Sequence, residues 1–155
     1  LMKPASVFPI VSVALAASLL AMSYARAEIP KQSKEKLQAL ASHALTGTIE
    51  RVYEHKEKRG DYEFTHGVAE VAVERVDKGT DVVANDRVFV RFWRQKWIGE
   101  GNSPPGHSGH WNIPARTDTA EIYVKGDRKT GFDVLSPNGF FKITRLKTVE
   151  TKPSP

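Results

Sequence analysis

The sequence predicts a mainly β protein: a small antiparallel OB-like barrel of five to six strands with a short N-terminal helix. Short segments in which apolar and polar residues alternate recur through residues 46–147, and clusters of Gly, Pro, Asn and Asp separate them. The sequence has no internal repeat, which argues against a propeller or a solenoid. A helix followed by short strands and tight turns is typical of a closed or nearly closed barrel. A β-sandwich is the alternative.

Residues 1–27 are predicted to be a signal peptide. Lys3 precedes an apolar stretch over 10–22, and residues 25–27 form an A-x-A cleavage pattern. The 13 apolar residues fall short of the roughly 20 that span a membrane, and no cysteine follows to accept a lipid. We expect a periplasmic or secreted protein with no stable membrane span after cleavage; an uncleaved membrane anchor is the alternative. The opening Leu1-Met2 suggests an alternative start codon and a bacterial source.

Residues 28–45 are predicted to form an N-terminal helical segment. The apolar residues Leu37, Leu40, Ala41 and Ala44 have the i, i+3, i+4, i+7 spacing of one helical face. Ser33 is the expected N-cap.

The barrel domain is predicted to occupy residues 46–147, with a flexible tail over 148–155. A first strand is expected in 47–53, followed by a charged break over 54–61 that ends in an Arg-Gly-Asp hairpin turn. A long strand then begins at residue 62. Its apolar positions change parity beside Gly67, which predicts a bulge or a sharp coil of the strand.

A third strand is expected around residues 88–93, followed by a loop over 94–118. That loop is 25 residues long, more than a compact domain normally holds unless the loop is functional. Alternation resumes in 119–125, and the turn "GDRKTG" predicts a hairpin with the strand around 132–135. The segment 140–146 is expected to add a final short strand or to extend the strand before it.

Composition excludes several classes of site. The chain has no cysteine, so disulfides, thiolate metal sites and a thiol nucleophile are excluded. Without Lys3 and Arg26, 21 of the 23 basic residues remain against 18 acidic ones, a formal net charge of +3. That excess is too small to demand a polyanionic partner.

The segments "AEVAVERVDKGTDVVANDRVFVRFW" and "AEIYVKGDRKTGFDVLSPNGFFKI" resemble exported OB-fold domains of the netrin and tissue-inhibitor-of-metalloproteinase (NTR-like) type. In that family a long strand ends in a Lys-Gly turn before the next strand, and a later hairpin closes the barrel. The resemblance implies ligand binding on one sheet face and in long loops. The family's inhibitors chelate zinc through an N-terminal cysteine. Residues 28–30 are Glu-Ile-Pro here, so that activity does not carry over.

An aromatic and basic segment is the predicted ligand-binding surface. Its residues are Arg91, Trp93, Arg94, Lys96 and Trp97, with Trp111 from the loop. Interleaved cations and flat rings can stack on planar or sugar rings while pairing with anions. A protein, a glycan or another cell-envelope component would suit it, whereas export and the small net charge argue against nucleic acid. The alternative is that one tryptophan fills the barrel end under the arginine stems.

The loop stretch "PPGHSGHW" is the candidate metal site. His107 and His110 are three residues apart, and imidazole is the commonest protein ligand for zinc or copper. Two ligands are too few, so His66, Asp118 or Glu100 would have to converge on them. If the metal site does not form, no cofactor is expected. In that case the prolines stiffen the loop and the glycines allow it to turn tightly, so that its side chains are held at the surface to bind a ligand.

No catalytic site is predicted. Residues 106–110 resemble a G-x-S-x-G elbow, but the last position is His110, and no strand followed by a helix surrounds them. The sequence therefore predicts an exported, non-enzymatic binding domain. A zinc- or copper-binding protein and a structural accessory domain without a ligand are the alternatives. Ligand identity and oligomeric state stay open.

Overall fold

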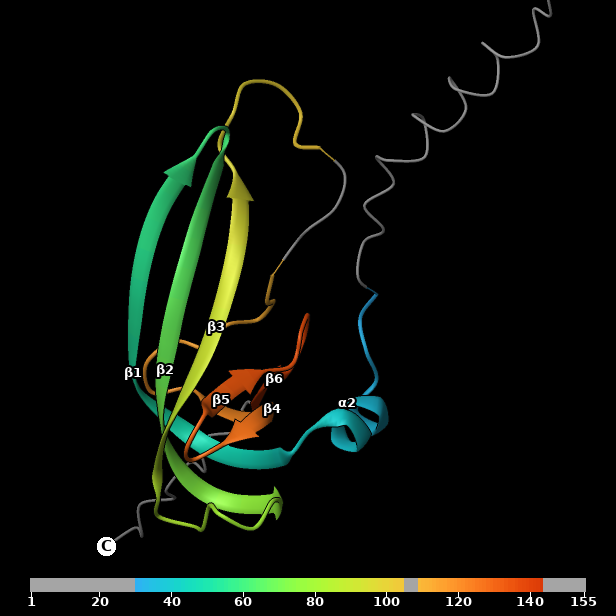
Figure 1. Ribbon diagram of the computed structural model, residues 1–155, viewed down its shortest axis with the longest axis vertical. Coiled ribbons are helices and arrows are strands. Elements are labelled where there is room, and N and C mark those ends of the chain that lie inside the picture. Colours follow the sequence, from blue (N-terminus) through green and yellow to red (C-terminus); the bar gives the residue numbers. More distant parts are fainter. Residues whose placement is uncertain (1–29, 105–108, 144–155) are drawn as a thin grey trace, which may run out of the picture.

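The structure is a computed structural model that describes residues 30–104 and 109–143. Its elements are α2 (Lys34–Leu40), β1 (His43–Arg59), β2 (Tyr62–Lys78), β3 (Arg87–Trp97), β4 (Thr119–Asp127), β5 (Gly131–Val134) and β6 (Phe140–Ile143) (Figure 1). The predicted signal peptide and tail lie outside the described residues. Within the described ranges, no helix has the length and apolar character needed to cross a membrane.

Five strands close into a barrel in the order β1, β2, β3, β5, β4 and back to β1, and β6 adds to β4. A mainly β fold built on a small barrel is therefore confirmed, in place of the sandwich. The barrel is mixed, however, because β3 and β5 run parallel at Val90↔Phe132 and Arg91↔Asp133. An all-antiparallel barrel was predicted, but an odd number of strands cannot close with every neighbour antiparallel.

The barrel core is made of apolar side chains that alternate along each strand and point inward. Its fully or nearly fully buried members include Leu45, Ile49, Ala69, Val71, Val88, Val90, Phe92, Ile122, Val124, Phe132 and Phe140. Register shifts between β1 and β2 lie at Ala44/Leu45, Thr46/Gly47 and Ile49/Arg51. Such irregularities bend a strand pair, and the lower parts of β1 and β2 turn across the base of the barrel (Figure 1).

Of the two alternatives predicted beside Gly67, the bulge is wrong. β2 keeps one continuous register with β1 and with β3 on both sides of this residue. The parity of the apolar residues changes for another reason. Ala69, Val71 and Val73 face the barrel core, whereas Phe64, His66 and Val68 lie on the opposite face of the same strand.

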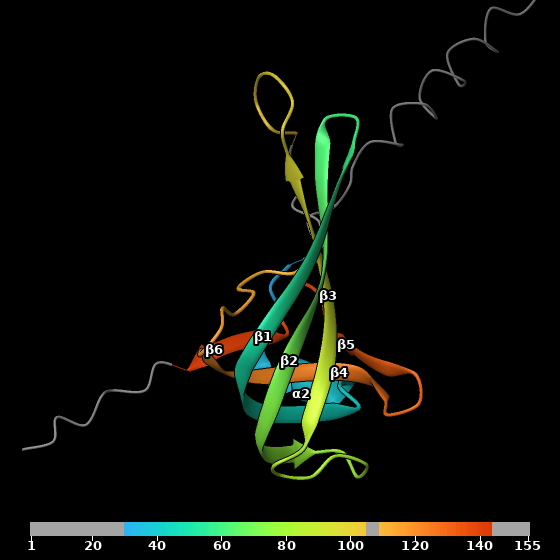
Figure 2. The same cartoon turned by 90° about the vertical axis from the view of Figure 1, so that its left-hand side faces the viewer.

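Strands β1, β2 and β3 extend well past the barrel as a three-stranded sheet (Figure 2). β4 pairs with β1 only over residues 43–48, and β5 pairs with β3 only at Val90 and Arg91. The predicted charged break at 54–61 is mostly strand, and only Gly60 and Asp61 turn. Similarly, the loop predicted to start at residue 94 starts at 98. In both places pairing with β2 keeps polar residues in strand conformation.

The N-terminal helix is shorter than predicted. Ser33 is its N-cap, as expected, and the Ser33 Oγ accepts a hydrogen bond from the Lys36 backbone N–H at 3.3 Å. The helix ends at Leu40, and Ala44 belongs to β1. The helical spacing of the apolar residues extended the predicted helix too far. Leu37 and Ala44 are buried in the same small cluster, but Leu37 lies on α2 and Ala44 on β1.

Candidate functional site

A groove of about 720 Å³ lies over β1, β2 and β3 where these strands leave the barrel. Side chains from two cross-strand rows line it. One row is His55–His66–Trp93, and the other is Tyr53–Val68–Arg91. Asp133, Val134 and Ser136 from β5 and the segment after it, with His110 from the loop, flank these rows. The groove thus joins the extended sheet to the barrel.

The two rows face solvent because strand side chains alternate between faces. Val90 and Phe92 point into the core, so Arg91 and Trp93 point away from it. Tyr53 is 48% exposed and Trp93 is 36% exposed. Two large rings are therefore held by regular strands with a large part of each open to solvent, and the Tyr53 hydroxyl donates to the Glu70 Oε2 at 3.0 Å.

Two charged residues of the groove lining, Arg91 and Asp133, neutralise each other, and a third, Glu54, pairs with Arg94 at 3.4 Å. Arg91 donates to both carboxylate oxygens of Asp133, with Nε and Nη2 each 2.7 Å from an oxygen, and its Nη1 and Nη2 are each 3.1 Å from the Thr130 carbonyl oxygen. The hydrogen bond from Arg91 lowers the pKa of Asp133 from its ordinary value. The pair therefore stays ionised at neutral pH and offers one planar donor group beside one acceptor group.

His110 joins β3 to β5 where their pairing stops. Its backbone N–H donates to the Trp93 carbonyl at 2.8 Å, and the Trp93 N–H lies 3.1 Å from the His110 Nδ1. The His110 Nε2 lies 3.0 Å from the carbonyl oxygen of Val134. A neutral ring with its proton on Nε2 accepts from the Trp93 N–H and donates to the Val134 carbonyl, while Nδ1 also lies 2.9 Å from the Trp93 carbonyl oxygen. The ring stands edge-on to the Trp93 indole with centroids 6.2 Å apart, which orients the indole in the groove.

The predicted metal site gains no ligand set. His107 lies outside the described residues, and both ring nitrogens of His110 face backbone groups. Asp118 pairs with Lys142 at 2.8 Å. In residues 30–104 and 109–143, no group of three or more His, Cys, Asp or Glu residues could hold a metal ion. Zinc or copper binding stays a prediction, and ligation through His110 would have to break one of its hydrogen bonds.

The structure divides the predicted binding residues between two faces of β3. Arg91 and Trp93 lie in the groove. Arg94 and Lys96 alternate to the opposite face, where the Arg94 Nη2 is 3.4 Å from the Glu54 Oε1. These residues are neighbours in the sequence but do not form one surface, because strand alternation separates them.

The two remaining tryptophans lie outside the groove lining. Trp97 is half-buried, with its ring 5.0 Å from that of Tyr62 in an edge-to-face contact. Trp111 is also half-buried, and its backbone N–H donates to the Pro137 carbonyl at 2.7 Å. Trp97 is the last residue of β3, at the end of the extension, so it does not fill the barrel end as the alternative expected.

Tyr53, His55 and Asp133 were not among the predicted site residues, and His66 was considered only as a metal ligand. The signal was present in the parity change of the second strand. Apolar and aromatic residues on the face opposite the core indicate an exposed apolar surface, whereas the prediction took the change as a bulge or a sharp coil.

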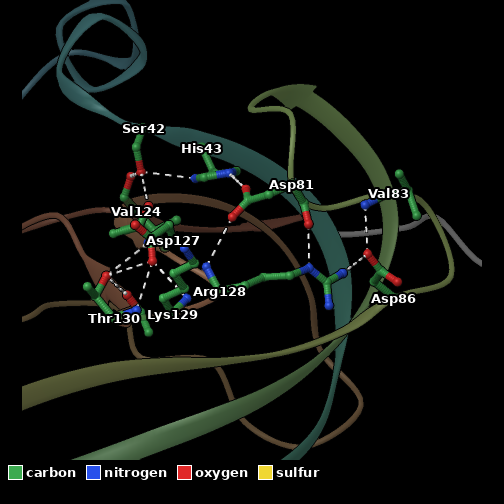
Figure 3. Close-up of polar contacts among 12 residues, drawn as sticks. Ser42, His43, Asp81, Val83, Asp86, Val124, Asp127, Arg128, Lys129 and Thr130 are labelled. Carbon is green, nitrogen blue, oxygen red and sulfur yellow. Dashed lines mark hydrogen bonds and ion pairs between the residues drawn. The ribbon is translucent and has the colours of Figure 1, made fainter.

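A second polar cluster lies at the base of the barrel (Figure 3). The Ser42 Oγ is 3.0 Å from the His43 Nδ1, and the His43 Nε2 contacts the Asp81 carboxylate. The Arg128 backbone N–H donates to Asp81 at 3.0 Å, and the Arg128 guanidinium contacts the Asp81 carbonyl and Asp86. The cluster joins the start of β1, the β2–β3 connection and the β4–β5 turn.

The Ser-His-Asp residues of this cluster take part in the packing of the barrel base. The Ser42 hydroxyl donates to the Gly126 carbonyl at 2.8 Å, which uses the proton that a nucleophilic serine gives to its histidine. The His43 ring is 5% exposed and makes an edge contact with Phe132 at 5.1 Å. A β-carbon on Gly79 would stand 2.0 Å from this ring, so the ring fills the space of the turn.

Fold and site together define a small mixed β-barrel with a three-stranded extension that carries an aromatic and histidine-lined groove. Comparisons of the chain with family models, with curated proteins and with solved structures find no match. The resemblance to NTR-like domains therefore stays a prediction.

Proposed function

We propose that the protein is an exported, non-enzymatic binding domain whose groove contacts a macromolecule or a glycan of the cell envelope. The observation that carries this proposal is the exposure of Tyr53 and Trp93 on adjoining rows of one groove. Exposed apolar surface in a concave site with a few polar groups is characteristic of ligand binding. The predicted signal peptide supports a periplasmic or secreted location.

Binding rather than catalysis fits the electrostatics of the groove. A general base works best when its pKa lies near the operating pH. Arg91 instead lowers the pKa of Asp133, and both carboxylate oxygens are already hydrogen-bonded to it. This carboxylate is suited to accepting hydrogen bonds from a ligand, and poorly suited to removing a proton.

The test is calorimetric titration of the purified protein with soluble polysaccharides and protein fractions from a bacterial envelope. We expect a ligand whose binding is lost in Trp93→Ala and kept in Phe89→Ala. Phe89 is the matched control because it is an aromatic residue on the same strand and face, 51% exposed, outside the groove lining. Equal loss of affinity in both variants, or no loss in either, would refute the groove as the binding site.

A further inference from the structure

The chemistry of the groove identifies the class of ligand, an inference that rests on the proposed function. The charged side chains of the groove are already paired with one another or with neighbours. Arg91 is committed to Asp133 and to the Thr130 carbonyl, and Glu54, the other charged residue of the lining, is paired with Arg94. Arg94 and Lys96 belong to the opposite face of β3. A polyanion gains affinity from cations that are free to pair with it. The groove therefore favours a ligand without net charge.

Two aromatic rings, those of Tyr53 and Trp93, lie on the two outer strands of the groove. Tyr53 on β1 and Trp93 on β3 flank Val68 and His66 on the central strand β2. Two strand spacings separate the outer strands by about 10 Å. The rings are thus spread along a groove that runs across the strands, and one elongated ligand can contact both.

The groove offers both hydrogen-bond donors and hydrogen-bond acceptors. The imidazoles of His55 and His66 are exposed, and a neutral imidazole offers one donor and one acceptor. The Arg91–Asp133 pair adds a planar donor group next to a planar acceptor group at the barrel side of the groove. Hydroxyl groups, which donate and accept at once, match such a mixture.

Only some ligand classes have all three properties. A pyranose ring has C–H groups on its faces, hydroxyls around its rim and no charge. A peptide added as a strand would use a sheet edge, but the edge of β1 beyond the barrel carries Arg51, Lys56 and Arg59, charges that discourage such pairing.

We infer that the groove binds a neutral polysaccharide chain laid across β1, β2 and β3. In this arrangement Tyr53 and Trp93 stack on sugar rings. His55, His66, Arg91 and Asp133 hydrogen-bond to hydroxyls.

The experiment is calorimetry of the full protein with three probes: neutral glucose-, mannose- and N-acetylglucosamine-based oligosaccharides, uronic-acid oligosaccharides, and single-stranded DNA. We expect binding to a neutral oligosaccharide that changes little between low and high salt. Affinity should fall about tenfold in Trp93→Ala and in Tyr53→Ala, which is the loss of one well-placed contact residue. Phe89→Ala should bind as the wild type does.

Two further variants keep the result interpretable. Trp93 contacts His110 through its backbone, so Tyr53→Ala on another strand guards against a folding defect, and thermal unfolding is measured for each variant. His66→Gln, which keeps a donor and an acceptor, should bind more tightly than His66→Ala.

The outcomes separate the two proposals. Groove-dependent binding of only the acidic oligosaccharide or only the DNA overturns the neutral-sugar inference and leaves the proposed function standing. Binding of a neutral oligosaccharide that is unchanged in both ring variants overturns the inference as well, because the ligand then lies elsewhere. If no probe binds and the envelope fractions also give no groove-dependent binding, both proposals fail.

Discussion

Gly67 on β2 lies directly beside the ring of Phe92 on β3: a β-carbon built on Gly67 would stand 2.1 Å from the Phe92 Cζ. The ring also meets Phe140 edge-on, with centroids 6.1 Å apart. Phe92 therefore covers the end of the barrel core directly beneath the sheet that carries the groove. The absence of a side chain at residue 67 makes this packing possible.

Gly67→Ala should consequently destabilise the protein. Overpacking a core typically costs about 1–3 kcal/mol, and we expect a loss in that range in the free energy of unfolding measured with denaturant. The double variant Gly67→Ala, Phe92→Leu should lose less than the two single variants lose together, because leucine vacates the space. Strictly additive losses would contradict the contact.

His110→Ala should lower stability through lost hydrogen bonds between β3 and β5. The variant leaves the Trp93 N–H and the Val134 carbonyl without their ring partner. Unsatisfied buried groups cost about 1–3 kcal/mol. Chemical denaturation measures this loss, with Lys96→Ala on the opposite face as the control that should stay near the wild type. A His110→Ala variant as stable as the wild type would show that the bridge contributes nothing.

Metal content provides a separate test of His110. Because both ring nitrogens already face backbone groups, we expect protein purified without a histidine tag to hold no zinc or copper that depends on this residue. Elemental analysis of the wild type and of the His107→Ala, His110→Ala double variant checks this. A stoichiometric metal lost in the double variant would establish the metal-binding alternative instead.

The cluster at the base of the barrel should make stability sensitive to acid. Hydrogen bonding, first of all from the Arg128 backbone N–H, lowers the pKa of Asp81. Likewise, the Val83 N–H, with a smaller contribution from Arg128, lowers the pKa of Asp86. A carboxyl whose folded pKa is lowered stabilises the protein above its unfolded pKa of about 3.9, and this stabilisation is lost as the pH falls through the folded pKa.

Unfolding curves measured from neutral pH to below pH 4 should therefore show a fall in stability that is smaller in Asp81→Asn than in the wild type. At neutral pH the same variant should be less stable than the wild type, because the ionised acceptor is gone. An acid profile that is identical in the two proteins would show that Asp81 does not contribute.

Local patterns predicted much of the fold. Alternation predicted the β3 strand and the β4–β5 hairpin, and Ser33 marked the start of the helix. The pairing of β3 with β5 could not be predicted, because contacts between distant strands leave no local signal. The charged residues of β1 likewise hide a strand, since pairing with β2 overrides their weak β propensity.

The candidate site was predicted in part for the same reason. Arg91 and Trp93 stand out as a cation and a large ring on one strand, but their neighbours in the groove come from other strands. Which residues join them depends on register, such as His55↔His66 and His66↔Trp93. Register follows from bulges and turns that the sequence does not locate reliably.

Barrel closure has a kinetic consequence. It joins His43 to Val124 and Val90 to Phe132, partners far apart along the chain. Folds dominated by such distant pairings form in milliseconds to seconds, whereas a hairpin like β1–β2 forms in about 1–10 μs. The β1–β2 hairpin therefore forms long before the barrel closes, and its apolar face is exposed to other chains in the meantime. The positive and negative side chains along β1 oppose aggregation during this interval.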